Sequence, residues 1–346
     1  MSIGIGIISF AHGHVSSYAT EIKKMTDARV IAAWDDDAER GVKQSAAAGA
    51  EFVPKLADLL ARKDIDAVFI ASETSKHAEH TIAAAKAGKN IVLQKPMAFK
   101  IEECDQICDV IKKTGVKFSM AWQMRCDPQN QWMRDTVQSG KLGKITLVRR
   151  RHGLGTQLWG EWFTNCWHVK PEFNLGMFMD DASHAADWLL WTFGKPDSVT
   201  AEIETLVNPK VPDDTGVALF RYPNGMLAVL ECPFTCVAAE DTTNIFAEKG
   251  TILQNYGDGP SCSNPPPPEN ARGLKFVMAG EKAWSPVDIP SPKGHGERIA
   301  AVARPAVEFL LGKRPEIATA DEGRLSTQMI LNAYRSAKEG KRIKFS

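Results

Sequence analysis

The sequence predicts a two-domain protein in which a parallel α/β domain precedes an α+β domain. Three observations predict this class: apolar and helical segments alternate up to about residue 121, strand-like segments dominate from residue 144 onward, and an Asn-Gly pair joins two of these strands. The 346 residues are enough for two hydrophobic cores. We place the boundary after residue 123, with residues 1–123 in the first domain and residues 124–346 in the second.

The first domain is predicted from short apolar runs that are each followed by a segment with helical periodicity. The predicted strands are residues 3–9, 30–34, 52–53, 66–72, 90–93 and 116–121. The predicted helices are residues 14–25, 38–48, 55–61, 75–87 and 101–113. Because strands joined by helices pair in parallel, we expect a Rossmann-type parallel sheet with helices on both faces.

The second domain is predicted to contain a large, open and mostly antiparallel sheet. Tyr222-Pro-Asn-Gly-Met226 lies between two apolar runs, a strong signal for a tight hairpin. A linking helix is predicted at residues 128–139, a surface loop in the proline-rich segment 261–270, and closing helices at residues 296–311 and 321–339. Further strands are predicted at residues 145–151, 198–205, 215–222, 226–233 and 243–247.

Composition favours a small-molecule partner. Lys and Arg total 42, and so do Asp and Glu, so no net charge attracts nucleic acid or an anionic membrane. No apolar run approaches the roughly 20 residues that a membrane helix needs, and the first residues do not resemble a secretory signal. We therefore expect a cytoplasmic protein with no nucleic-acid or membrane partner.

The turn after the first predicted strand is the candidate site for a pyrophosphate. Dinucleotide-binding domains usually carry G-x-G-x-x-G here, whereas this chain has Ser9-Phe10-Ala11-His12-Gly13-His14. Ser9 and Ala11 are small enough to let the backbone approach a phosphate, and Gly13 partly substitutes for the missing glycine. The earlier Gly4 and Gly6 lie within the strand and are not part of this turn.

Asp35 ends the second predicted strand, where an acid can accept hydrogen bonds from both hydroxyls of the adenosine ribose. Asp36 and Asp37 follow and would repel a 2′-phosphate, so NAD is favoured over NADP. The alternative is that these three acids only cap the next helix, whose N-terminus they would also stabilise.

Four segments, in order along the chain, resemble the Gfo/Idh/MocA family, named for glucose-fructose oxidoreductase and inositol dehydrogenase. The first runs from Asp66 to Gln94-Lys95-Pro96, with Gln94 where the family usually has Glu. The second begins at Trp122-Gln123-Met124-Arg125, and the third, Gly176 to Asp187, has the pattern Asp, three residues, His, two residues, Asp. The fourth is Ala320 to Arg342, which is similar to the family's terminal helix.

The resemblance implies an NAD-dependent oxidoreductase that acts on the hydroxyl or carbonyl of a sugar, cyclitol or sugar derivative. It also implies a homo-oligomer, a dimer or tetramer, in which the outer face of the second sheet packs against another subunit. Beyond the turn and Asp35, the cofactor-binding residues that it implies are Ser72, His77, Gln94, Lys95, Gln123 and Arg125.

The candidate catalytic residues are Lys95, Asp180 and His184. Lys95 follows the carboxyl end of a strand, where open α/β sheets bind ligands, although an arbitrary lysine there is usually exposed. Asp180 and His184 lie on one stripe of a helix with Asp187. The family position implies that His184 exchanges the proton and that Lys95 polarises the oxygen. The alternative makes Asp180 and Asp181 helix caps and His184 a packed helix residue.

An aromatic segment, residues 158–168, is the candidate substrate platform. The rings of Trp159, Trp162 and Trp167 would stack on the C–H faces of a pyranose or cyclitol, while His168 would hydrogen-bond to its hydroxyls. Lys95, Asp180 and His184 complete the predicted substrate-binding residues. A subunit contact or a small hydrophobic cluster explains the same tryptophans equally well.

Three rival functions remain open. His12-x-His14 and His77-x-x-His80 are compatible with a zinc hydrolase barrel, although such a barrel should keep alternating to its end. Within the family, some members oxidise a glycoside, eliminate its aglycone and return the hydride. The altered glycine turn also leaves room for a cofactor-free binding protein. On the favoured interpretation no residue is assigned to a metal.

Overall fold

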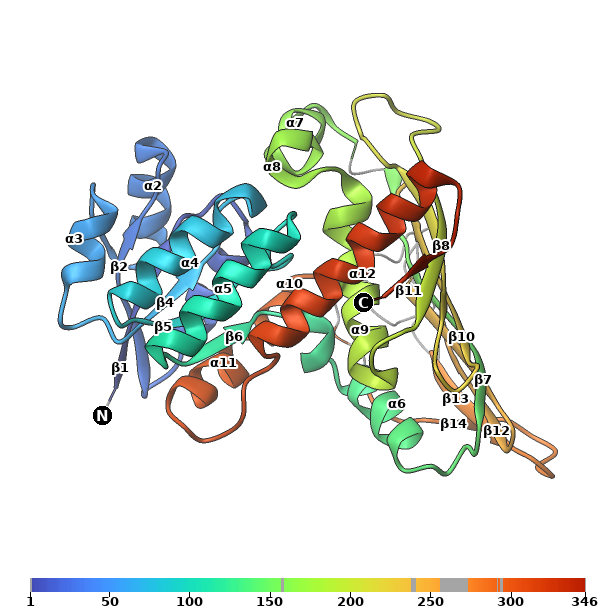
Figure 1. Cartoon of the computed structure of the whole chain (residues 1–346). Helices are drawn as coiled ribbons and strands as arrows, with labels where there is room; N and C mark the ends of the chain where they lie inside the picture. The colour runs from blue at the N-terminus through green and yellow to red at the C-terminus, as the bar shows by residue number, and fades with distance from the viewer. Residues whose placement is uncertain are drawn as a thin grey trace. The chain divides into compact units, whose positions relative to one another are not determined.

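The computed structural model describes residues 2–156, 159–237, 241–255, 273–290, 292 and 295–345 (Figure 1). Contacts divide the chain into two compact units: Met1–Gln123 with Ile299–Thr327, and Met124–Arg298 with Gln328–Ser346. Residues 299–327 thus belong with the first unit although they follow the second in sequence. The loop predicted at residues 261–270 lies outside the described residues.

The first unit contains a six-stranded sheet, sheet A, in which all neighbouring strands pair in parallel. Its order is β3-β2-β1-β4-β5-β6, so the chain starts at the centre and builds outward in both directions. This confirms the predicted parallel sheet. The strands are β1 (Ile3–Ile8), β2 (Ala28–Trp34), β3 (Glu51–Phe52), β4 (Ala67–Ile70), β5 (Asn90–Leu93) and β6 (Phe118–Met120).

Capping residues and a left-handed glycine set the ends of the helices in the first unit. Asp37 caps the N-terminus of α2, and Gly115 ends α5 with a left-handed φ of 69°. The first helix ends three residues before the predicted Met25, because i to i+3 hydrogen bonds close its last turn. The helices are α1 (His14–Ile22), α2 (Ala38–Ala48), α3 (Leu56–Ala61), η1 (Thr74–Lys76), α4 (His77–Lys86) and α5 (Ile101–Thr114).

The single helix predicted at residues 296–311 is wrong, because the chain forms α10 (His295–Ala300) and α11 (Ala303–Leu310). Pro305 has no amide hydrogen, and its ring would clash with the carbonyl of residue 301 in a continuous helix. The segment after α11 then runs beside β6, where the Met120 amide donates to Ala318 O (2.9 Å). It thereby covers an edge of sheet A.

The second unit contains a nine-stranded sheet, sheet B, with order β14-β13-β12-β11-β7-β10-β9-β8-β15. β7 and β10 pair in parallel and the other neighbours pair antiparallel, as predicted for a mostly antiparallel sheet. The strands are β7 (Ile145–His152), β8 (Ser198–Glu204), β9 (Thr215–Arg221), β10 (Leu227–Pro233), β11 (Asp241–Ala247), β12 (Gly250–Gln254), β13 (Leu274–Met278), β14 (Ser285–Pro286) and β15 (Ile343–Lys344).

The predicted hairpin is confirmed between β9 and β10. The amide of Tyr222 donates to the carbonyl of Met226 (2.9 Å), and Gly225 adopts a φ of 84° that favours glycine. Strands β12 to β15 were not predicted, since they are short or lie far along the chain from their partners.

One buried helix, α9 (Met177–Phe193), packs on the face formed by β7 and β10. Apolar residues surround most of it, as expected for a helix without a solvent face. The other helical elements of this unit are η2 (Gln123–Cys126), α6 (Pro128–Gln138), α7 (Glu161–Asn165), η4 (Trp167–Val169), α8 (Pro171–Asn174) and the end of α12 (Ala320–Glu339). No helix of the described residues is long and apolar enough to cross a membrane.

The packing of α9 depends on a glycine in β9. A Cβ atom built on Gly216 would lie 2.2 Å from the ring of the buried Phe178. We expect Gly216→Ala to destabilise the protein by about 1–3 kcal/mol, because the ring must move within a close-packed core. Thermal unfolding measures the effect. The matched control is Gly160→Ala, since nothing lies within 4 Å of a Cβ there; equal melting temperatures for the two variants would contradict the expectation.

Candidate functional site

Two hydrogen bonds and a left-handed residue define the turn after β1, residues 9–14. Ser9 adopts a φ of 67°, the left-handed region in which glycine is usual. The Ala11 amide donates to Ser9 Oγ (3.1 Å) and the His12 amide to Ala71 O (2.8 Å), which fixes the turn against β4. A Cβ on Gly13 would meet nothing within 4 Å, so open space lies beside the first turn of α1.

Asp35 is part of this turn and does not cap a helix. Its Oδ2 accepts from the Phe10 amide (2.7 Å), and both of its oxygens contact the guanidinium of Arg40 at 2.6–2.9 Å. Asp37 is the residue that caps α2, through the Arg40 amide. The capping alternative therefore holds for Asp37 and not for Asp35, whose carboxylate is held beside the pyrophosphate turn.

Gln94, at the carboxyl end of β5, links this turn to the next strands. Its Nε2 lies 2.6 Å from His14 Nδ1 and 3.4 Å from His12 Nε2, while its Oε1 accepts from the Tyr18 hydroxyl (3.0 Å). An amide can donate to imidazole and accept from phenol at the same time, which the glutamate usual in the family cannot do. The replacement thus suits the two histidines of the altered turn.

Ser72 follows β4 and His77 begins α4, and both side chains are buried. The His77 ring contacts two backbone carbonyls, Pro96 O (Nδ1, 2.7 Å) and Ser72 O (Nε2, 3.1 Å), and His80 Nδ1 contacts Ser72 Oγ (3.0 Å). Burial lowers the pKa of His77 and of His80 to about 4. Both rings are therefore neutral near pH 7 and hold the backbone around Lys95, itself a buried side chain.

The zinc hydrolase alternative is wrong for this fold. Strand–helix alternation stops after β6, and a mostly antiparallel sheet follows. The four histidines proposed as its ligands instead contact Gln94, Ser72 and backbone carbonyls.

In the second unit, α9 brings buried polar side chains to one face. The Asp187 carboxylate forms a bidentate ion pair with Arg125 at 2.7 and 2.9 Å. Arg125, which the resemblance assigned to the cofactor, is thus engaged by the last residue of the predicted stripe. Two turns earlier on the helix, Asp180 Oδ2 lies 2.7 Å from His168 Nδ1. An acid and a histidine from separate segments therefore form a pair that the helical spacing alone did not indicate.

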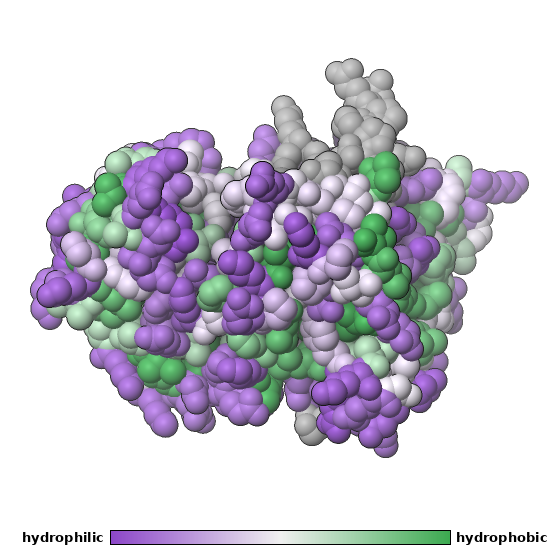
Figure 2. All heavy atoms as spheres, turned by 90° about the horizontal axis from the view of Figure 1, so that it is seen from above, coloured by the Kyte–Doolittle hydropathy of each residue, from purple (hydrophilic) through white to green (hydrophobic). Residues whose placement is uncertain are grey.

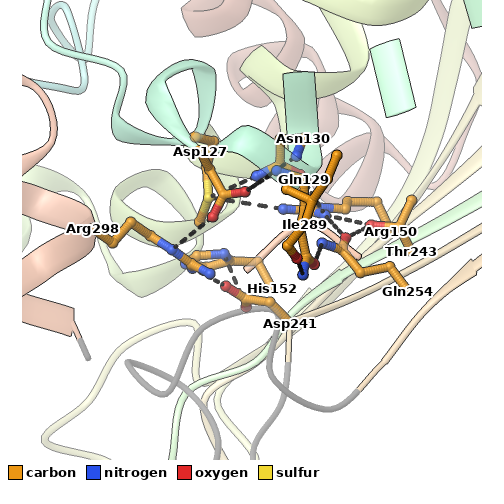
Figure 3. A network of polar contacts seen from close by, with 11 residues as sticks. Asp127, Gln129, Asn130, Arg150, His152, Asp241, Thr243, Gln254, Ile289 and Arg298 are labelled. Carbon is orange, nitrogen blue, oxygen red and sulfur yellow. Dashed lines mark hydrogen bonds and ion pairs between the residues drawn. The ribbon is translucent and has the colours of Figure 1, made fainter. Parts of the chain in front are cut away.

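His152 is a residue that the sequence did not reveal. It ends β7, directly opposite Asp241 on β11, and its ring centroid lies 5.1 Å from that of His184. Its Nδ1 is 3.1 Å from Asp241 Oδ1, and Asp241 Oδ2 accepts from Arg298 (2.9 Å). Figure 3 shows these contacts beside a second buried group around Arg150. The sequence signal was that Arg150 and His152, two residues apart in a strand, share one face of it. This spacing does not predict which residues they contact.

Burial raises the pKa of Asp241, but the neighbouring His152 and Arg298 outweigh it and hold that pKa well below its usual range. Asp241 is therefore a carboxylate at neutral pH. Arg150 in turn contacts Thr243 and lies 3.2 Å from Gln254 Oε1 and 3.3 Å from Asn130 Oδ1.

The aromatic segment divides into three environments. Trp159 packs with Phe163 against the cluster of Val169, Met177, Val211 and Phe234, as the hydrophobic-cluster alternative requires. Trp162 is 77% exposed on α7. Trp167 stacks on His168 with ring centroids 3.8 Å apart. Of the three tryptophans, Trp167 lies next to a candidate site residue through this stacking.

The strand order of sheet A is that of Rossmann domains, which bind the adenosine ribose at an acid ending the second strand. The first unit is therefore of the class that binds dinucleotides in oxidoreductases.

Comparison with known proteins agrees with this class. Residues 2–122 match the model of an oxidoreductase family with an NAD-binding Rossmann fold, and residues 130–253 match the GFO/IDH/MocA C-terminal domain. The chain belongs to the Gfo/Idh/MocA family of oxidoreductases, and NAD is its cofactor.

Among curated relatives, the chain is 26% identical to myo-inositol 2-dehydrogenase of Thermotoga maritima over 72% of this chain and 73% of that protein. It is 24% identical to 1,5-anhydro-D-fructose reductase of Ensifer adhaerens over 66% and 69%. The WlbA dehydrogenase of Bordetella pertussis, solved with NADH and UDP-GlcNAcA, has the same fold, with a TM-score of 0.82, 23% identity and coverage of 100% of this chain and 98% of that one.

NAD fits the residues of the first unit. The space beside Gly13 suits a pyrophosphate at the N-terminus of α1, and the carboxylate of Asp35 suits ribose hydroxyls. The surrounding charges are Asp35, Asp36, Asp37 and Glu73 against Arg40 and Lys76, an excess of acid that disfavours a 2′-phosphate.

We expect Asp35→Ala to raise the dissociation constant of NAD by about 10–100-fold, because two hydrogen bonds to the ribose are lost. The same change should reduce the preference for NAD over NADP. Titration calorimetry with both nucleotides measures this. Asp37→Asn is the control, since it keeps a capping side chain outside the turn. An unchanged NAD affinity in Asp35→Ala would remove Asp35 from the site.

Proposed function

We propose that the chain is an NAD-dependent dehydrogenase or reductase of a sugar, a cyclitol or a sugar derivative. In this proposal residues 1–123 bind the cofactor, with Ser72, His77, Gln94, Gln123 and Arg125 around it, and residues 124–346 supply most substrate contacts. Lys95, Asp180 and His184 act on the reacting oxygen. The observation that carries the proposal is the buried acid–histidine face of α9 in a chain of an NAD-binding family.

The reaction needs a hydride acceptor and a proton acceptor. NAD, when bound, would supply the hydride acceptor, and the hydroxyl proton would pass to a side chain of the protein. Lys95 is suited to hold and polarise the oxygen, since an ammonium group stabilises a developing alkoxide. The side chains of Asp180 and His184 are suited to receive the proton, and the Asp180–His168 pair at 2.7 Å extends that route.

The substrate class rests on chemistry and on the relatives. Trp167 stacked on His168 presents a flat apolar face beside hydrogen-bonding groups, the combination that a carbohydrate ring requires. The ring of Trp162 on α7 is exposed, so Trp162 contributes to binding only if the substrate or another chain reaches that helix.

The test is to incubate the protein with NAD and a panel of polyols, free sugars and glycosides. Accumulation of NADH with a sugar or polyol supports the dehydrogenase. Release of an aglycone without net NADH supports the redox-neutral glycoside-cleaving enzyme of the same family instead. Neither product with any member of the panel, in the presence of bound NAD, would contradict the proposal.

On the best substrate, Lys95→Ala and His184→Ala should each lower turnover at least about 100-fold, while the dissociation constant of NAD changes little. The reason is that both side chains act on the substrate oxygen and not on the cofactor. Steady-state kinetics and calorimetry measure the two quantities. The exposed Lys100→Ala is the control for loss of a neighbouring lysine; unchanged turnover in Lys95→Ala would end its assignment.

We also propose that the outer face of sheet B forms a homo-oligomer. α6 and α9 lie on one side of this sheet in Figure 1, and hydrophobic residues reach the surface where its strands lie at the right of Figure 2. Leu147, Phe246, Val217 and Leu219 of three central strands are each more than a third exposed on this face.

Exposed apolar side chains grouped on one face of a sheet favour an interface, and the ion pairs of Arg149 and Arg151 with Glu231 on the same face make it a mixed apolar and charged surface. We expect light scattering to give a dimer or tetramer, and Phe246→Glu with Leu219→Glu to shift it toward the monomer. Val42→Glu, an exposed apolar residue of the first unit, is the control. A monomeric wild-type chain at micromolar concentration would contradict the proposal.

A further inference from the structure

The end of β7 and one face of α9 bring two histidines and an aspartate together. His152, Asp181 and His184 are all buried, and one ligand atom of each lies within 4.8 Å of the other two. Of the residues that the structure describes, they form the one group of three or more such side chains close enough to share an ion. Asp181 and His184 are three residues apart on α9, a spacing by which helices present a carboxylate and a histidine to one metal.

Asp241 and Arg298 orient the ring of His152 on the side away from Asp181. Its Nδ1 faces the Asp241 carboxylate at 3.1 Å, and Arg298 holds Asp241 at 2.9 Å (Figure 3). A tautomer with its proton on Nδ1, the nitrogen beside that carboxylate, has its lone pair on Nε2, which lies 3.9 Å from Asp181 Oδ1. A carboxylate behind a histidine is the arrangement that orients metal-ligating imidazoles and raises their basicity.

The distances permit one shared ion. Nitrogen and oxygen ligands lie about 2.0–2.2 Å from a bound transition metal, so two ligand atoms are at most about 4.4 Å apart. The His152–Asp181 pair is already within this limit. The remaining separations need to close by only a few tenths of an ångström.

The charges around the group favour a cation. Arg150 and Arg298 are buried with Asp127 and Asp241, two positive and two negative side chains in one network. Asp181 adds a further carboxylate beside two imidazoles, which are neutral when they bind a metal.

We propose that His152, Asp181 and His184 hold a divalent transition-metal ion, such as Zn²⁺, Mn²⁺ or Fe²⁺. Two imidazoles and one carboxylate are a ligand set for these ions, and three protein ligands leave positions open for oxygen atoms. Asp241 and Arg298 are positioning residues of this site. The sequence interpretation that assigned no metal ligand is replaced by this proposal.

The proposal deepens the proposed function, on which its last step rests. With the ion in place, the open positions take hydroxyl or carbonyl oxygens of the sugar, whose charge the ion stabilises as a Lewis acid. His184 then acts as a ligand, and the proton passes to Asp180 and His168. Glycoside cleavage after oxidation would gain from the same ion, since removal of a proton next to a carbonyl builds negative charge on its oxygen.

The test begins with the full chain freed of metal by a chelator. Zn²⁺ and Co²⁺ are titrated by calorimetry, bound metal is counted by elemental analysis, and the visible spectrum of Co²⁺ reports its ligands. We expect one ion per chain. His152→Ala and Asp181→Asn should weaken binding more than about 100-fold, and Asp241→Asn by about 10–100-fold as an outer partner.

His168→Ala is the matched control, because it removes a histidine that pairs with an aspartate of the same helix but leaves the three ligands. Its metal affinity should equal that of the wild type. Binding that survives both His152→Ala and Asp181→Asn would overturn the site, and so would the absence of binding to the wild-type chain. The titration of the wild-type chain can contradict the proposal by itself, even if a variant fails to fold.

Failure of the metal site and failure of the proposed function give different results. NAD binding and NADH formation are measured on the same chelated and reloaded protein. Turnover that drops at least about 10-fold on chelation, at unchanged NAD affinity, supports the Lewis-acid role. Full turnover without metal overturns that role but leaves the dehydrogenase, whereas metal binding without any turnover on the panel contradicts only the proposed function.

Discussion

The second unit is organised around buried charges, which must therefore pair with one another. Removing water from a carboxylate or guanidinium costs several kcal/mol per ion, about as much as a small protein's whole stability, unless partners replace the water. Arg125 with Asp187 and Arg298 with Asp241 meet this requirement at 2.7–2.9 Å. The Arg125–Asp187 pair joins η2 to α9, and the Arg298–Asp241 pair joins α10 to β11, so each links segments that are far apart in sequence. The first pair ties the helix that carries the acid–histidine face, and the second ties the strand opposite His152.

A comparable constraint acts in the first unit, but it works through neutral groups. The Gln94 amide, the neutral rings of His77 and His80 and the hydroxyls of Tyr18 and Ser72 link the carboxyl ends of neighbouring strands. Low pKa values keep these two imidazoles uncharged near pH 7, so the surroundings of Lys95 gain no further positive charge from them. One ammonium group at this edge is therefore set among groups that position it without competing for an anionic oxygen.

Periodicity and turn chemistry predicted much of the fold, because both depend on neighbours in sequence. The alternation of strands and helices up to residue 121 and the Asn224-Gly225 hairpin are of this kind. Pro305 is also a local signal, and it disfavours the single helix predicted across residues 296–311. Strand β15 could not be predicted, because two residues have no periodicity and their partner β8 lies about 145 positions earlier.

The same distinction applies to the site. Local patterns, a strand end or a helix stripe, made it possible to predict four site residues from the sequence: Asp35, Lys95, Asp180 and His184. His152 and Asp241 were not, since 88 residues separate two side chains that face each other only when β7 pairs with β11. The sequence offers Asp181 only as a helix cap, whereas in the structure its side chain is buried with Oδ1 3.9 Å from His152 Nε2.

Residues 299–327 belong to the first unit although most of the second unit precedes them in sequence. The first unit therefore cannot be obtained as one continuous stretch of the chain. Asp27 binds Arg304 from the returning segment, and the Ser119 hydroxyl accepts from the Ile317 amide at the edge strand β6. A gene fragment that stops at codon 123 would leave an acid without its guanidinium and a sheet edge open to self-association. Transplanting this nucleotide-binding unit into another protein therefore requires two separate pieces of the chain, and recombination at a single crossover would not transmit it intact.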